Sequence, residues 1–229
     1  MKNVDSTKPV LFVLTSHGNK GDTGSTGFYL GEVTHPLEVL QEAGIKVEIA
    51  SIQGGEPPID GMDLNDEVNA HFWQDEAFRE AIRTTLPLDK VDPARYSAIF
   101  FAGGHGAMWD FPISAAVRTV ARGIYEAGGI VAAVCHGPAA LVNITLSDGS
   151  YLVAGKNIAT FTDSEERAVG LDKTVPFLLA STLLARGAKH EPAADWSVKV
   201  VTDGRLVTGQ NPQSAAGVGA ALRDLLTAR

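Results

Sequence analysis

The chain has 229 residues, of which 45% are hydrophobic and 20% are charged, and its formal net charge at pH 7 is −8. This length and composition are typical of one globular α/β domain, and with a single cysteine they exclude a disordered chain and a miniprotein held together by disulfides. The acidic balance without a Lys/Arg cluster argues against a nucleic-acid or membrane-surface partner, and because the sequence has neither ~20 successive apolar residues nor a signal segment, we expect a cytoplasmic protein.

Short apolar runs and amphipathic segments alternate along the chain. The apolar runs predict strands that are buried on both faces of a parallel sheet, at residues 9–14, 47–51, 98–102 and 130–134. Helices are expected where apolar side chains recur at helical spacing, over residues 34–43, 114–127, 174–186 and 213–226. Because strand and helix alternate, we predict right-handed βαβ units in a doubly wound, mostly parallel α/β sheet sandwiched between helices.

Two segments depart from this alternation. Strands expected at 196–202 and 205–208 flank Asp203-Gly204, a dipeptide that favours a tight hairpin, and they predict a small antiparallel addition to the sheet. Residues 53–91 are rich in Asp, Pro and Gly and predict an insertion at the rim of the sheet. We therefore expect residues 1–229 to form a single domain.

The only cysteine lies directly after a predicted strand. Cys135 follows the apolar run 130–134, and the small residues Ala133, Gly137 and Ala139 surround it. A sharp turn from a strand into a helix forms a nucleophile elbow, which presents a side chain at the carboxyl edge of the sheet. The N-terminus of the following helix and the adjacent histidine favour thiolate over thiol. We predict that Cys135 is a reactive nucleophile rather than an inert buried residue.

Two further segments are expected at the same edge of the sheet. Residues 101–107 are rich in glycine and follow a predicted strand, so their backbone N–H groups can approach an oxyanion; an ordinary turn is the alternative. Glu32 lies just before a predicted helix, with Leu30 and Val33 as apolar neighbours. Such surroundings raise the pKa of a carboxyl and suit it to proton transfer, whereas charge alone favours a solvent-exposed Glu32.

The six histidines raise the question of a metal site. No two are spaced four residues apart, as in a helical zinc motif, and a lone cysteine excludes a thiolate cluster, so we expect no functional metal. His17 and His105 follow predicted strands and are expected to line a substrate pocket. Trp109 is expected to join them, with plain packing as the alternative.

Several blocks of the sequence, in this order, resemble the ThiJ/PfpI superfamily: GFYLGE at 27–32 followed by HP at 35–36, AGGHG at 102–106, VCHGP at 134–138, and FTD at 161–163. Trp109-Asp110 and the segment DGRLVTGQNP at 203–212 are similar to the branch of heat-shock chaperones and glyoxalase III enzymes. The resemblance covers nearly the whole chain. It implies the flavodoxin-like fold of class I glutamine amidotransferases, a homodimer, and a catalytic centre without a metal or an organic cofactor.

The resemblance also implies roles for individual residues. Cys135 matches the nucleophile of the family, His136 matches the adjacent histidine, and Glu32 matches the glutamate that contacts the thiol. Gly104 and His136 match the residues whose backbone N–H groups form the oxyanion hole. These residues would make up the catalytic centre.

The carboxylate that orients His136 is harder to assign. The family's glutamate aligns with Glu166 or, after a shift of one residue, with Glu165, and Asp163 lies close by; we favour Glu166. Neighbouring residues of a helix point about 100° apart, so one of the two glutamates is expected to face the crevice and the other to face solvent. Capping of a helix N-terminus is the alternative role for these carboxylates.

These matches predict a glutathione-independent glyoxalase that converts methylglyoxal and similar 2-oxoaldehydes to 2-hydroxy acids. The Cys135 thiolate would add to the aldehyde carbon, Glu32 would move a proton through an enediol, and hydrolysis of a thioester would release the product. A second hypothesis is a stress-related holding chaperone for unfolded clients, or a protein deglycase, with Cys135 as a redox sensor. A third is a cysteine peptidase or amidohydrolase.

Overall fold

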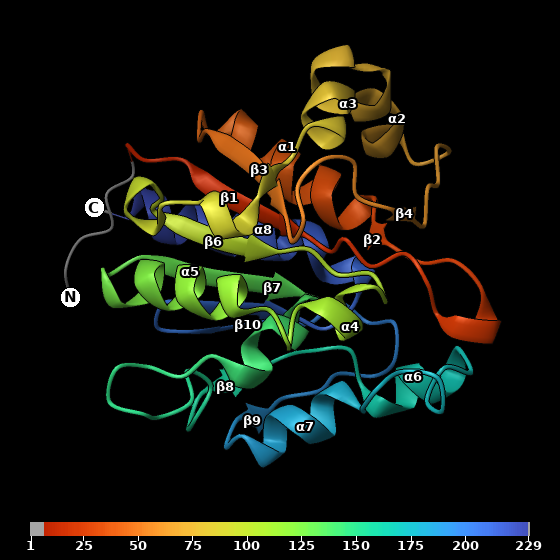
Figure 1. Ribbon diagram of the computed structural model, residues 1–229, viewed down its shortest axis with the longest axis vertical. Coiled ribbons are helices and arrows are strands. Elements are labelled where there is room, and N and C mark those ends of the chain that lie inside the picture. Colours follow the sequence, from red (N-terminus) through yellow and green to blue (C-terminus); the bar gives the residue numbers. More distant parts are fainter. Residues whose placement is uncertain (1–6, 229) are drawn as a thin grey trace.

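A seven-stranded sheet runs through the centre of the molecule (Figure 1). The computed structural model describes residues 7–228 and orders the strands β10-β11-β7-β6-β1-β3-β5. Neighbouring strands are parallel except for the β10–β11 pair at one edge, which confirms the predicted doubly wound α/β fold and its small antiparallel addition. The strands are β1 (Val10–Leu14), β3 (Val47–Ser51), β5 (Leu86–Pro87), β6 (Ala98–Phe101), β7 (Ile130–Val134), β10 (Val200–Asp203) and β11 (Leu206–Gly209).

Helices cover both faces of this sheet. They are α1 (Gly31–Glu42), α2 (Glu67–Gln74), α3 (Glu76–Arg83), α4 (Ala107–Asp110), α5 (Ala115–Glu126), α6 (Asp163–Ala168), α7 (Leu179–Ala185) and α8 (Ala215–Thr227). Successive residues of a strand point to opposite faces, so Leu11 and Val13 of β1 enter the core with α5, whereas Val10, Phe12 and Leu14 enter the core with α1 and α8. All residues of β1, β6 and β7 are buried, which explains why these strands are continuous apolar runs.

Shorter elements complete the fold. Two small parallel pairs join β2 (Phe28–Tyr29) to β4 (Ile59–Asp60) and β8 (Asn157–Ile158) to β9 (Lys189–His190). The 3₁₀ helices are η1 (Gly21–Thr23), η2 (Leu88–Lys90), η3 (Pro93–Arg95), η4 (Gly137–Asn143) and η5 (Pro212–Ser214). Within residues 53–91 the chain forms β4, α2, α3 and β5, and β5 pairs with β3 at the edge of the main sheet. None of the helices in residues 7–228 is long and apolar enough to cross a membrane.

Several boundaries differ from those expected from the sequence. Helix α1 begins at Gly31, so Glu32 lies inside its first turn rather than before it. The strand expected from Trp196 begins only at Val200, because Trp196 has a φ of +64°, which a strand does not allow. Helix α7 starts at Leu179, five residues later than expected. The hairpin turn is centred one residue later than expected, since Asp203 still pairs with β11.

Candidate active site

Cys135 lies at a sharp turn at the carboxyl end of β7. Its φ is +59°, a left-handed conformation that residues other than glycine rarely adopt, and the residue is only 3% exposed. The 3₁₀ helix η4 begins two residues later, and a Cβ on Gly137 would lie 2.2 Å from the carbonyl oxygen of Phe101. Only glycine therefore fits at this position. The strained, buried turn has the form of the nucleophile elbow that the sequence predicts.

The Glu32 carboxyl lies beside this thiol. Its Oε2 accepts a hydrogen bond from the Gly103 N–H at 2.8 Å, whereas its Oε1 accepts no hydrogen bond from an N–H or O–H group of residues 7–228. Glu32 is fully buried, so the alternative of a solvent-exposed side chain is wrong. Burial raises the pKa of Glu32 to about 8, against the lowering influence of Cys135 and Gly103. A carboxyl with such a pKa can both donate and accept a proton near neutral pH.

The thiol and the Glu32 carboxyl influence each other's ionisation. Burial raises the pKa of the Cys135 thiol well above its usual value, a negative charge on Glu32 raises it further, and the His136 backbone N–H lowers it. The helix end and the adjacent histidine were expected to favour a thiolate at neutral pH. Burial and the Glu32 carboxylate instead favour the neutral thiol. Because two neighbouring negative charges disfavour each other when buried, the Cys135–Glu32 pair loses its two protons in separate steps.

Glu166 joins two histidines. Its Oε2 accepts a hydrogen bond from His136 Nε2 at 2.7 Å, and its Oε1 accepts one from His105 Nε2 at 2.8 Å. His136 Nδ1 lies 3.3 Å from Cys135 Sγ, which completes a series of thiol, imidazole and carboxylate. Although burial raises it, the hydrogen bonds from the two histidines lower the pKa of Glu166 to about 2. Burial lowers the pKa of His136 to about 4, so a neutral imidazole faces an ionised carboxylate.

Helical spacing predicts that Glu165 faces solvent, but the residue is fully buried. Its Oε1 accepts the Trp196 N–H at 2.9 Å. The same carboxylate accepts further hydrogen bonds from Thr162, Gln210 and Asn211. The two adjacent glutamates do point to different places, but the chain around Trp196 covers Glu165. The third candidate, Asp163, accepts a hydrogen bond from Ser181, and the structure places Glu166 beside His136.

A cavity of about 330 Å³ opens onto the thiol. Glu32, Gly104, His105, Cys135 and His136 line it, so the structure brings together most of the site residues expected from the sequence. Gly104 has a φ of +98°, and a Cβ there would lie 2.2 Å from the carbonyl oxygen of Gly27. Glycine therefore allows the loop after β6 to pass close to the chain before β2 at the edge of the cavity.

His17 and Trp109 do not line this cavity. Their rings stack on each other with centroids 5.1 Å apart, and His17 Nε2 lies within hydrogen-bond distance of the Asn19 carbonyl oxygen. The expectation that they bind substrate in the same pocket as Cys135 therefore does not fit the geometry. Both follow the ends of β1 and β6, as expected, but these loops carry the two side chains toward each other and away from the thiol.

Other residues of the cavity wall were not singled out in the sequence: Lys20, Tyr29, Asp60, Phe161, Val169, Trp196, Pro212 and Gln213. The centroid of the Phe161 ring lies 4.3 Å from that of the His136 ring and 5.8 Å from that of the Trp196 ring. Phe161 therefore packs directly against one of the candidate catalytic residues. Tyr29 and Phe161 belong to blocks that carry the family resemblance, and that position could have identified them. Lys20 and Trp196 lie in irregular loops that have no such signal.

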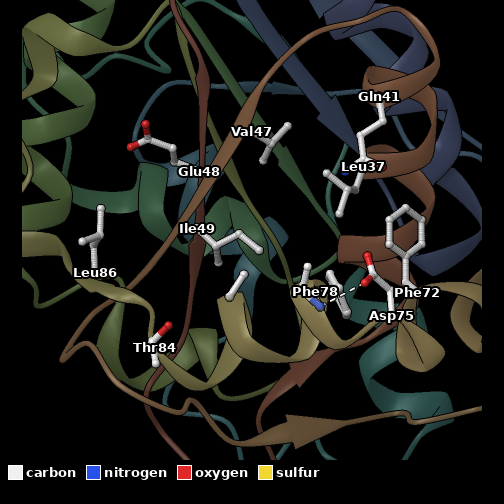
Figure 2. Close-up of a pocket in the computed structure, with 12 residues that line it drawn as sticks. Leu37, Gln41, Val47, Glu48, Ile49, Phe72, Asp75, Phe78, Thr84 and Leu86 are labelled. Carbon is white, nitrogen blue, oxygen red and sulfur yellow. Dashed lines mark hydrogen bonds between the residues drawn. The ribbon is translucent and has the colours of Figure 1, made fainter.

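A second groove, of about 420 Å³, lies between α1, β3 and the α2–α3 segment (Figure 2). Leu37, Val47, Ile49, Phe72 and Phe78 provide much of its lining. None of its lining residues, all within the described part of the chain, is a cysteine or a histidine. We therefore place the chemistry at Cys135 and not in this larger groove.

Comparisons with known proteins point to one family. A model of the DJ-1/PfpI family matches residues 25–222. The chain is 33% identical to glyoxalase 3 of Candida albicans over 219 residues, which cover 90% of this chain and 93% of that protein. It is also 33% identical to the glutathione-independent glyoxalase HSP31 of Saccharomyces cerevisiae over 225 residues, which cover 91% and 93%.

Solved structures are also similar to this chain over nearly its whole length. The rapid encystment protein of 24 kDa from Francisella tularensis superposes with a TM-score of 0.92 at 39% identity, over 96% of this chain and 99% of that one. Glyoxalase III from Candida albicans superposes with a TM-score of 0.87 at 32% identity, over 95% and 96%. These matches confirm the resemblance that the sequence blocks predict.

Proposed function

The chain belongs to the DJ-1/PfpI family, and we propose that it is a glutathione-independent glyoxalase that converts methylglyoxal and similar 2-oxoaldehydes to 2-hydroxy acids. The observation that carries this proposal is the buried Glu32 carboxyl beside the Cys135 thiol. A peptidase needs a nucleophile and a proton donor for an amine. A second, protonatable carboxyl at the nucleophile instead suits a reaction in which a proton moves between adjacent carbons.

In the first step the Cys135 sulfur adds to the aldehyde carbon and forms a hemithioacetal. The aldehyde oxygen takes up the proton of the Cys135–Glu32 pair, so Glu32 is left as a carboxylate. The Gly104 and His136 N–H groups are proposed to donate hydrogen bonds to the oxygen as its negative charge develops. Covalent capture by the thiol takes the place of glutathione as the carrier of the aldehyde.

In the second step the Glu32 carboxylate removes the proton from the carbon that is bonded to sulfur. The resulting enediol takes this proton back at the adjacent carbon, and the hydroxyl proton moves between the two oxygens, so that a 2-hydroxy thioester forms. Water then attacks the thioester, and the sulfur leaves as the thiol and regains a proton. His136, held by Glu166 with Nδ1 toward the sulfur, is placed to carry the protons on oxygen and sulfur. No oxidant is consumed.

Purified protein incubated with methylglyoxal and no glutathione is expected to form lactate. The Cys135→Ala and Glu32→Gln variants should fold and form none, because one lacks the nucleophile and the other cannot accept a proton. Glu42→Gln, an exposed change on the same helix α1, is the matched control and should behave as wild type. Lactate formation by Glu32→Gln at the wild-type rate would overturn the proposed role of Glu32.

A second candidate function, the holding of unfolded chains, is supported by the apolar groove of Figure 2, which lies apart from Cys135. The two functions separate in Cys135→Ala, which would lose turnover and still suppress aggregation of a model client. Assembly as a homodimer and a cytoplasmic location remain predictions. Light scattering on the purified protein and fractionation of cells would test them.

A further inference from the structure

One cluster at the active site has a composition that the glyoxalase reaction does not require. One ring nitrogen of His105, one ring nitrogen of His136 and one carboxylate oxygen of Glu166 lie within 4.8 Å of one another, and they form the single group of this kind among residues 7–228. The reaction needs only His136 to be oriented, and Glu166 does so through Oε2. The second carboxylate oxygen, Oε1, accepts a hydrogen bond from His105, a residue of the cavity wall.

Two imidazole nitrogens and a carboxylate oxygen are ligands that Zn²⁺ prefers. In a tetrahedral zinc site such ligand atoms lie about 3.4 Å apart, given bonds of about 2.1 Å. The Nε2 atoms of His105 and His136 lie 2.8 Å and 2.7 Å from the two different oxygens of the Glu166 carboxylate. One ligand atom from each of the three residues lies within 4.8 Å of the other two, so side-chain adjustments of about an ångström bring them to zinc-site spacing. His105 is 17% exposed, whereas His136 and Glu166 are nearly covered, so an ion would enter from the cavity and keep its fourth position open there.

We propose that His105, His136 and Glu166 form a Zn²⁺ site, and that zinc bound there reversibly inhibits the enzyme. The binding site follows from the geometry alone, whereas the inhibition rests on the proposed function. No bond in the protein breaks and no electron is transferred. The ion takes the place of the Nε2 proton of each histidine, and on each neutral ring the proton moves to the other nitrogen, Nδ1.

The inhibition follows from the two nitrogens of the His136 ring. With Nε2 donating to Glu166, Nδ1 is free to accept a proton from the Cys135 sulfur 3.3 Å away. A zinc ion on Nε2 moves the ring proton to Nδ1, because a neutral imidazole has one N–H. Nδ1 then cannot accept a proton, and His136 can no longer take part in proton transfer during turnover.

Equilibrium dialysis against Zn²⁺ alone tests the site without reference to activity. The wild-type chain is expected to bind one ion, and so is Cys135→Ala, since the thiol is not a ligand. His105→Gln and Glu166→Gln should each weaken binding at least tenfold. His71→Gln, a change at an exposed histidine, is the matched control and should bind as wild type does. Circular dichroism of each variant verifies its fold, and two independent ligand variants guard against the failure of either one.

Three outcomes would overturn the proposal. Loss of binding in Cys135→Ala with retention in His105→Gln would assign the ion to the thiol, and a thiolate-to-metal charge-transfer band in the Co²⁺-loaded protein would say the same. Equal binding by all variants would place the ion elsewhere. Binding at the expected residues without loss of lactate formation would refute the inhibition alone. A protein that binds zinc as expected but forms no lactate without zinc would instead refute the proposed function.

Discussion

The carboxylate of Glu165 accepts a hydrogen bond from the backbone N–H of Trp196 at 2.9 Å. This bond holds Trp196 at the mouth of the cavity, where its ring packs edge-on against Phe161 and Phe161 packs against His136. Glu165 therefore positions part of the cavity wall, while its neighbour Glu166 accepts a hydrogen bond from His136. One turn of α6 positions both.

Replacing Glu165 with glutamine is expected to destabilise the protein by about 1–3 kcal/mol, because an amide nitrogen would face buried N–H donors that now have an acceptor. Loosening of Trp196 should raise KM for methylglyoxal more than it lowers kcat. Urea unfolding and steady-state kinetics measure the two effects, with Glu42→Gln as control. A variant as stable as wild type with unchanged KM would show that Glu165 does not hold this wall.

The Glu166→Gln change should lower kcat by a factor on the order of 10–10². Glutamine has one acceptor oxygen in place of two, so it cannot hold both His136 and His105. The Cys135 thiol should still react with an alkylating agent, since its reactivity does not depend on the outer hydrogen bond alone. Full activity of this variant would remove Glu166 from the mechanism and leave a Cys135–Glu32 pair.

The Glu32→Gln change is expected to lower the pH at which Cys135 becomes reactive to an alkylating agent. A negative Glu32 raises the pKa of the thiol, and the neutral amide removes that charge. The rate of alkylation as a function of pH gives the midpoint for each variant. A higher midpoint in Glu32→Gln would show the opposite, namely that a protonated Glu32 stabilises a resting thiolate.

The pH profile of the wild-type enzyme should reflect the same pair. Burial raises the pKa of Glu32 to about 8, so at lower pH both the carboxyl and the thiol hold a proton and the base is missing. As the pH rises through about 8 the pair loses one proton, and kcat/KM should rise with it. A value of kcat/KM that stays constant from roughly pH 6 to pH 8 would contradict a raised pKa for Glu32.

The Gly104→Ala change tests the tight approach of the loop after β6 to the chain before β2. Its Cβ would lie 2.2 Å from the Gly27 carbonyl oxygen, which adds a steric cost of about 1–3 kcal/mol to the strain of a φ of +98°. Gly149→Ala is the control, since its φ is +85° and no atom lies within 4 Å of the new Cβ, so only strain of about 1–2 kcal/mol remains. Thermal unfolding should separate the two variants. Equal losses of stability would show that the loop moves freely.

The local pattern of the sequence determined much of the fold. Runs such as 10–14 and 130–134 are apolar at every position because both faces of a central parallel strand are covered, and this requirement acts residue by residue. The small residues around Cys135 mark the sharp turn there, although Gly137 is also required by the nearby Phe101 carbonyl oxygen of β6. Six of the seven strands of the main sheet, their mostly parallel direction and the position of the thiol could therefore be predicted, whereas the strand order and β5 could not.

Only the tertiary structure decided which side chains meet in the cavity. His17 and His105 both follow central strands, but the segments after β1 and β6 take different courses. His105 therefore reaches Glu166, whereas His17 stacks on Trp109. Helical rotation separates Glu165 from its neighbour but cannot reveal that the chain around Trp196 covers it. The ionisation of the Glu32 carboxyl likewise depends on its tertiary surroundings. The pKa of Glu32 is raised by the surroundings that several distant segments build together, and no window of sequence contains them.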